Sequence, residues 1–209
     1  MTTPFSLPRD IFREWSKAVS TDAELRTHLE GAIRQVLTEY DTAIYENRFI
    51  VGGVVEYIVL AAINGSGVAK GTHVGAKQKG VDVRIDFFRG EPCSADVSIK
   101  YSSSGNIRMI NTLGASVDAQ WSEATLFVLP EMGIVYADAA QIPKSAIVRM
   151  KDAISVSRRA VLKHAKKNDT FVLPMNIPAK HDTTSFGSSK TASEDIARVI
   201  IQQFIRLKL

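Results

Sequence analysis

Apolar residues recur every three or four positions along residues 10–40, which is the spacing of one face of an amphipathic helix. The repeat breaks at Ser20-Thr21-Asp22. Thr21 or Asp22 is suited to cap a second helix there, because its side-chain oxygen can accept a hydrogen bond from an unpaired backbone N–H. This first part of the chain is therefore predicted to form two consecutive helices.

Residues 47–67 are apolar on almost every side of a predicted helix, which indicates a buried helix ending near Asn64-Gly65. Glu56 is the one acidic residue in this stretch. A carboxylate in apolar surroundings is costly unless it is paired or bound to a cation. Gly52 and Gly53 lie one turn before Glu56, which leaves room for another element or a ligand to approach it.

The pattern changes to strict alternation in residues 80–102, "GVDVRIDFFRGEPCSADVSIKYS", which predicts two strands joined by a turn. One face of this hairpin is apolar, with Val81, Val83, Ile85 and Phe87 beside Ala95, Val97, Ile99 and Tyr101. The opposite face displays Asp82, Arg84 and Asp86 beside Asp96, Ser98 and Lys100. Two neighbouring strands with such polar rows indicate either a solvated sheet face or an active site.

Residues 124–130 and 133–139 are apolar strands of the kind that is buried on both faces in a sheet covered by helices. Residues 143–167 are predicted to form a long basic helix, with an apolar stripe made of Ile147, Met150, Ile154, Val161 and Ala165. A strand over residues 170–178 and a helix over residues 191–209, with a capping box from Thr191 to Glu194, complete the chain. Residues 66–80 and 102–114 have the composition of loops.

This order predicts an α/β fold, a mixed central sheet flanked by helices. We expect one domain over residues 1–209, with a helical part at 1–46, a core at 47–140 and a basic part at 141–209. No apolar run of about 18 residues is free of charges, and the first residues lack the order of a secretory signal. A cytoplasmic protein without membrane association is therefore expected, and the single Cys93 excludes an internal disulfide.

Charge is distributed unevenly along the chain. Residues 1–140 hold 13 Lys and Arg against 17 Asp and Glu, whereas residues 141–209 hold 13 against 5. A basic segment suggests a polyanionic partner, of which nucleic acid is the commonest, although a solvated basic surface has the same composition. The four histidines show no paired metal-binding spacing, which disfavours a zinc site.

Gly80-Val81-Asp82, a hairpin, and then Val97-Ser98-Ile99-Lys100 resemble the core of the PD-(D/E)-x-K nuclease superfamily, best known from type II restriction endonucleases. The resemblance covers about residues 50–137. It implies a restriction-endonuclease-like fold and Mg²⁺-dependent hydrolysis of double-stranded DNA. It also implies that Asp82 is the central metal-binding aspartate, Lys100 the catalytic lysine, and Glu56 the helical acid that contacts the metal directly or through water.

Two residues depart from the family pattern. Val81 replaces a proline, which is a mild variation, and Ser98 stands where an acid usually precedes the lysine by two residues. Some restriction enzymes with serine there recruit an acid about a dozen residues downstream, but Thr112-Leu113-Gly114 offers none. The missing ligand would come from Glu56, from Asp86 or Asp96 through irregular strand geometry, or not at all.

Two functions follow from the resemblance. The first is an active endonuclease, acting as a homodimer because two strands must be cut, with a possible cognate methyltransferase; repair, phage processing or RNA cleavage are variants of it. The second is a catalytically inactive DNA-binding or assembly subunit. DNA is expected to contact the basic helix and two loops, with candidate residues Lys70, Lys77, Lys79, Arg108, Arg158 and Arg159.

Each candidate also has a purely structural explanation. Asp82 could be a solvated strand residue, and Lys100 could be an edge-strand lysine that discourages aggregation. Glu56 could form a buried ion pair, for which Lys100 is an attractive partner. Asp86 and Asp96 are expected to be surface residues rather than metal ligands.

Overall fold

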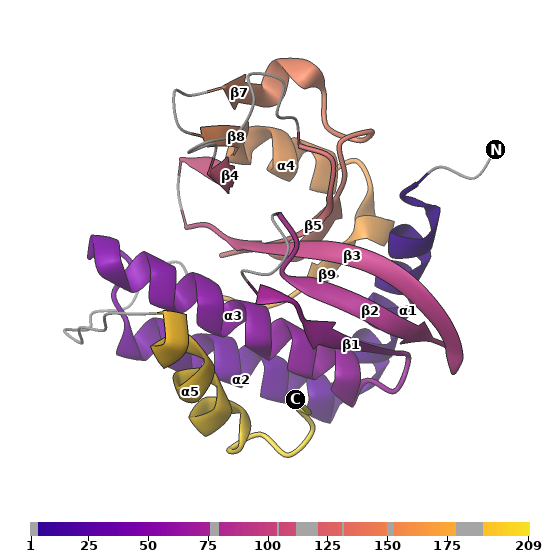
Figure 1. The fold of residues 1–209 in the computed structure, drawn as a ribbon, viewed down its shortest axis with the longest axis vertical. Coiled ribbons are helices and arrows are strands. Elements are labelled where there is room, and N and C mark those ends of the chain that lie inside the picture. The colour runs from indigo at the N-terminus through magenta and orange to yellow at the C-terminus, as the bar shows by residue number, and fades with distance from the viewer. Residues whose placement is uncertain are drawn as a thin grey trace.

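A computed structural model describes residues 4–75, 80–103, 105–111, 121–130, 132–149, 153–178 and 190–209 of the chain. Its helices are α1 (Ser6–Thr21), α2 (Ala23–Glu39), α3 (Tyr45–Gly65), α4 (Arg158–Ala165) and α5 (Lys190–Ile201) (Figure 1). Its strands are β1 (Ala69–His73), β2 (Val83–Phe88), β3 (Glu91–Tyr101), β4 (Asn106–Asn111), β5 (Ala124–Leu129), β6 (Gly133–Ala137), β7 (Ile147–Arg149), β8 (Ala153–Ser157) and β9 (Val172–Pro174). Short 3₁₀ turns occupy Lys144–Ala146 and Asp169–Phe171.

The strands form two sheets. The larger has six strands in the order β1-β2-β3-β5-β6-β9, and the smaller has three in the order β4-β8-β7. Strands β3 and β5 run parallel, whereas the other described pairs are antiparallel. The sheet is therefore mixed and flanked by helices, as the pattern of the sequence predicts.

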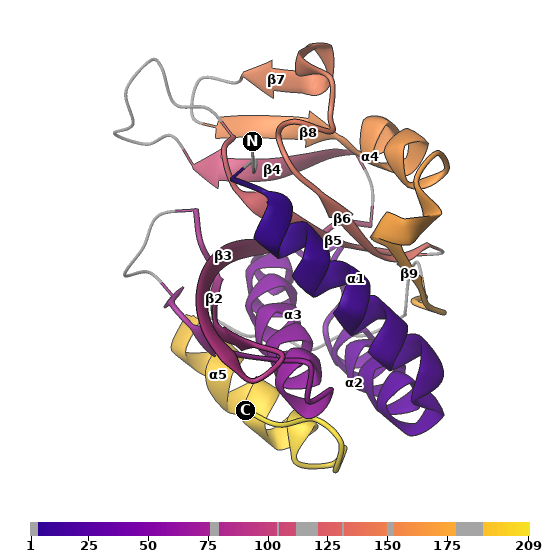
Figure 2. The same cartoon turned by 90° about the vertical axis from the view of Figure 1, so that its right-hand side faces the viewer.

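Helices and the smaller sheet cover opposite faces of the six-stranded sheet. Figure 1 shows α2, α3 and α5 on one side of it and α4 with β4, β7 and β8 on the other, and Figure 2 shows α1 running beside α2. Strand β5 serves both sides, since Leu126 and Val128 join the core under the helices while Phe127 and Leu129 join the core under α4. The prediction of a strand buried on both faces is confirmed.

The helical half follows the sequence pattern closely. The break between α1 and α2 falls at Asp22, whose carboxylate accepts a hydrogen bond from the Leu25 backbone N–H at 2.9 Å. By length and composition, one helix in the described part of the chain could cross a membrane: Glu46–Gly65 of α3, with a mean hydropathy of 1.5. Its apolar side chains pack in the core between α2, α5 and the sheet, and Val54, Val55 and Ile58 are completely buried.

The predicted helix over residues 143–167 is wrong. A 3₁₀ turn, β7 and β8 precede the helix, which begins only at Arg158. Strand β8 is the middle strand of the smaller sheet, and its Ile154 and Val156 are buried. β-Branched side chains suit such a strand, and an apolar repeat across two short strands imitates helical spacing.

Four other elements also differ from their predictions. Residues 69–73 and 106–111, expected to be loops, are β1 and β4. Strand β9 is shorter than predicted, and α5 ends at Ile201, after which the chain continues in turns to Leu209. The side chain of Thr191 lies outside the described residues, so the proposed capping box stays a prediction.

Candidate active site

Asp82 lies at the entrance of β2, where the strand begins to pair with β3. Its backbone N–H donates to the Val97 carbonyl at 3.1 Å, and its own carbonyl accepts from Val74 N–H at 2.9 Å. Since Val83 opposes Val97 in the antiparallel register, Asp82 comes opposite Ser98. The side chains of Asp82, Ser98 and Lys100 therefore share the polar face predicted from alternation.

Three donors converge on one oxygen of the Asp82 carboxylate. The backbone N–H of Ile99 and the ammonium of Lys100 each lie 2.7 Å from Oδ2, and the Ser98 hydroxyl lies 2.9 Å from it. Within the described residues no hydrogen bond reaches Oδ1. Among the described residues, the carboxylate is thus held through one oxygen, and its other oxygen can accept a hydrogen bond from water or bind a cation.

The cluster is largely withdrawn from solvent. The side chains of Asp82 and Lys100 are 17% and 20% exposed, and Ser98 is buried. Buried polar groups are tolerated when they are hydrogen-bonded, as these are. The structural explanation of Asp82 as a freely solvated strand residue does not fit these contacts.

Glu56 approaches from α3, but its direct partner is a residue that the sequence analysis did not select. Its Oε2 lies 3.0 Å from Nε2 of His73, the last residue of β1. Burial raises the pKa of Glu56 above its usual value, and the charge of Asp82 raises it further, whereas the hydrogen bond from His73 and the charge of Lys100 lower it. Glu56 therefore lies within electrostatic range of Asp82 and Lys100.

The His73 ring is held by a second contact. It stacks on Tyr57 at 4.1 Å between ring centroids and an interplanar angle of 21°. The Tyr57 hydroxyl in turn donates to Glu194 of α5 at 3.2 Å, and Glu194 forms an ion pair with Arg198 at 2.7 Å. Burial, with the neighbouring charge of Glu194, raises the pKa of Tyr57 to about 12, so its hydroxyl stays protonated and remains a donor.

The remaining acids of the hairpin contact other neighbours. Asp96 forms a two-point ion pair with Arg84, through Nε at 2.8 Å and Nη2 at 3.2 Å. Asp86 accepts a hydrogen bond from the Thr72 hydroxyl at 3.2 Å. These contacts suit the expected surface role of both acids.

The candidate DNA-binding residues do not form one row. Lys70 lies on β1, Arg108 on β4 and Arg159 on α4, all exposed, while Arg158 is half-buried and donates to the Pro130 carbonyl at 3.4 Å. Lys77 and Lys79 lie outside the described residues. With the long basic helix replaced by two strands and an eight-residue helix, a DNA-binding surface on that helix is no longer supported.

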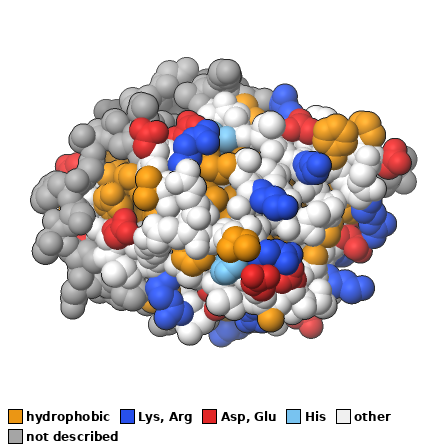
Figure 3. Space-filling view, turned by 90° about the horizontal axis from the view of Figure 1, so that it is seen from below, with side chains coloured by type: hydrophobic (Ala, Val, Ile, Leu, Met, Phe, Trp, Pro, Cys, Tyr) orange, Lys and Arg blue, Asp and Glu red, His pale blue; other side chains and the backbone are white. Residues whose placement is uncertain are grey.

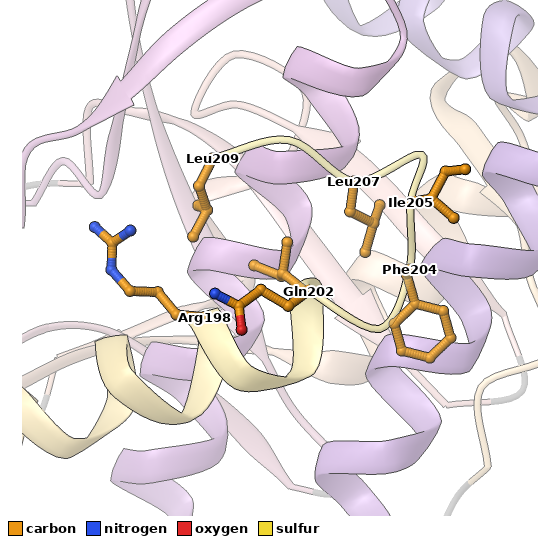
Figure 4. Close-up of a pocket in the computed structure, with 7 residues that line it drawn as sticks. Arg198, Gln202, Phe204, Ile205, Leu207 and Leu209 are labelled. Atoms are coloured by element: carbon orange, nitrogen blue, oxygen red, sulfur yellow. The ribbon is translucent and has the colours of Figure 1, made fainter.

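The face seen in Figure 3, below the sheet of Figure 1, carries Lys and Arg scattered among acidic and apolar side chains. A hollow of about 230 Å³ lies beyond the end of α5 and is bordered by Arg198, Gln202, Phe204, Ile205, Leu207 and Leu209 (Figure 4). This hollow contains none of the predicted site residues, so it is separate from the candidate active site.

The described part of the chain contains no group of three or more His, Cys, Asp or Glu side chains placed to hold one metal ion. No protein-family model matches the chain, and neither does any curated protein or solved structure.

Proposed function

We propose that the protein is a Mg²⁺-dependent endodeoxyribonuclease, of the type II restriction endonuclease kind, that hydrolyses duplex DNA. The observation that carries the proposal is the Asp82–Lys100 contact of 2.7 Å, made across two adjacent strands with one carboxylate oxygen left unengaged by the described residues. Glu56, within electrostatic range of both, supports the same function.

The position of these residues in the fold supports a restriction-endonuclease-like core. Helix α3 carries Glu56 and precedes the hairpin, Asp82 directly precedes β2, Lys100 lies near the end of β3, and the apolar β5 pairs with β3. This is the order of elements that the family resemblance implies.

Two carboxylates suit a hard divalent cation. Mg²⁺ is commonly held by one or two protein carboxylates together with water and substrate phosphate, so a site without a third protein ligand is compatible with it. Asp82 and Glu56 would hold the ion. When bound, Mg²⁺ supplies charge neutralisation at the phosphate and a water molecule of lowered pKa.

The protein's own groups have distinct roles in this proposal. Lys100 places a positive charge beside Asp82, where it would stabilise the charge that develops on the scissile phosphate. Ser98 and the Ile99 N–H hold the carboxylate of Asp82 in one orientation. Ser98 is thus a positioning residue in the place where the family usually has an acid.

The same serine favours a second candidate function, a catalytically inactive DNA-binding or assembly subunit. Its hydroxyl is buried and directed at Asp82, so it adds no negative charge to a metal site. In that case the protein would bind DNA without cutting it in Mg²⁺ or Mn²⁺, and Ca²⁺ would not tighten the binding.

Substitution of Lys100 tests the leading proposal. We expect Lys100→Ala to slow nicking of supercoiled plasmid in Mg²⁺ by at least about 10²-fold, because one preorganised charge at the phosphate is lost, while DNA binding in Ca²⁺ is retained. Lys17→Ala, which removes an exposed lysine of α1, serves as the matched control and should cut normally. Equal cleavage by Lys100→Ala and the wild type would refute the mechanism.

A further inference from the structure

Glu56 and His73 present two metal-binding atoms to the same small space. Oε2 of Glu56 and Nε2 of His73 are 3.0 Å apart. Two ligand atoms bound side by side to an octahedral ion at about 2.1 Å are themselves about 3.0 Å apart. A cation that replaces the shared proton would therefore find the two ligand atoms at a suitable separation, once the imidazole and the carboxylate have turned toward it.

The surroundings favour a cation at this place. The side chains of His73 and Glu56 are only 16% and 21% exposed, and the Tyr57 stack fixes the plane of the imidazole. A buried carboxylate is stabilised by a nearby positive ion.

We propose that His73 joins Glu56 as a direct ligand of the divalent ion, through Nε2 and Oε2, with Asp82 reached through a bound water and a DNA phosphate as a further ligand; Mn²⁺ is the ion that reports it. This deepens the proposed function and rests on it for the phosphate ligand, whereas metal binding itself can be measured without DNA. His73 is then a metal ligand that the PD-(D/E)-x-K pattern does not supply.

The ligand types select the metal. Mg²⁺ prefers oxygen ligands, whereas an imidazole nitrogen favours first-row transition ions. Zinc sites in proteins usually have three or four protein ligands, and the described residues offer two here. Mn²⁺ shares the preference of Mg²⁺ for carboxylate and water and, as a first-row transition ion, also accepts an imidazole, so it suits a site that Mg²⁺ occupies in the proposed function.

Titration of the protein with Mn²⁺, followed by the loss of the free-ion electron paramagnetic resonance signal, tests the inference. We expect wild-type protein to bind one ion, and His73→Phe to weaken binding at least about tenfold, since loss of metal-site partners costs about 10- to 100-fold in affinity. Phenylalanine keeps the ring stacked on Tyr57 and removes both nitrogens. Glu56→Gln should weaken binding similarly, and His73→Leu, which also removes both nitrogens, carries the same prediction if His73→Phe does not fold.

His28→Phe is the matched control, because it makes the same replacement at a histidine of α2 that contacts Phe204 and the Arg206 backbone. It should bind Mn²⁺ like the wild type. No Mn²⁺ binding by the wild type, or equal binding by folded His73→Phe, would overturn the inference.

The outcome is separable from that of the proposed function. Mn²⁺ binding that requires His73, in a protein that cuts no DNA, would uphold the metal site and refute the nuclease. Metal-dependent cleavage combined with unaltered Mn²⁺ binding in His73→Phe would refute this metal site and leave the nuclease intact.

Discussion

Two pairs of oppositely charged side chains join the neighbouring strands of the hairpin. Their members on the first strand, Asp82 and Arg84, are two residues apart. The Asp82–Lys100 pair has a contact of 2.7 Å, and the Arg84–Asp96 pair has one of 2.8 Å. In the first pair the side chains are 17% and 20% exposed, and in the second they are 38% and 33% exposed. The two ion pairs therefore have similar contact distances but differ in how far their side chains are exposed to solvent.

The use of the carboxylate oxygens separates the pairs more sharply than distance does. Arg84 engages both oxygens of Asp96. In contrast, the three donors on Asp82 share Oδ2, and no described residue donates to Oδ1. An acid that is fixed on one side and open on the other is suited to bind a ligand, whereas an acid engaged on both sides is suited to hold two strands together.

Replacement of the two aspartates gives the largest expected difference. Asp82→Asn should reduce Mg²⁺-dependent plasmid cleavage by at least about 10³-fold, because stabilisation by a bound metal is worth several kcal/mol and about 1.4 kcal/mol is a tenfold change in rate. Asp96→Asn should cut at close to the wild-type rate in the same assay. Strong losses in both variants would erase the contrast between the pairs.

Ser98→Ala tests how far the first pair depends on its third donor. A hydrogen bond to a charged group contributes about 1.5–3 kcal/mol, and Asp82 keeps two other donors, so we expect unfolding free energy to fall by about 1.5 kcal/mol. Urea denaturation measures this, with Ser20→Ala on the exposed side of α1 as the control that should change little. An unchanged midpoint for Ser98→Ala would mean that the hydroxyl does not position Asp82.

The smallest effect is expected at the second pair. A double-mutant cycle of Arg84→Ala and Asp96→Ala should give a coupling free energy that is smaller than the Ser98 effect and that falls further with added salt, because water and ions screen exposed charges. The coupling free energy from the same cycle for Asp82→Ala and Lys100→Ala should depend less on salt. A stronger or less salt-sensitive coupling for Arg84 and Asp96 would reverse the proposed ranking.

Local patterns predicted the parts of the fold that are decided locally. The Asp22 cap, the apolar α3 and the alternating hairpin each follow from side chains a few residues apart. The hairpin turn also follows from local chemistry, since Arg89 and Gly90 both adopt positive φ angles, which suits a two-residue connection. Strand β4 could not be found in this way, because its partner β8 lies far along the chain. Strand β1 has a polar sequence that resembles a loop, and its pairing with β2 makes it a strand.

The sequence predicted only part of the candidate site, because local patterns find residues of one hairpin and miss a partner from another element. Asp82, Ser98 and Lys100 lie on one hairpin, so alternation placed them on one face. His73 belongs to β1, whose polar sequence resembles a loop, and its contact with Glu56 depends on β1 pairing with β2. The available signal was the unpartnered acid in an apolar helix, which required a polar partner from another element.

The parallel pairing of β3 with β5 has a consequence for folding kinetics. The β2–β3 hairpin closes over two residues, so Asp82 and Lys100 can meet early, in the time of a local event. Strand β5 returns to β3 only after residues 102–123, which include β4 in the other sheet, and such non-local closure loses chain entropy before contacts form. We expect the pairing of β5 with β3 to be the slow step of folding. Asp82 and Lys100 would then be in contact before the six-stranded sheet around them is complete.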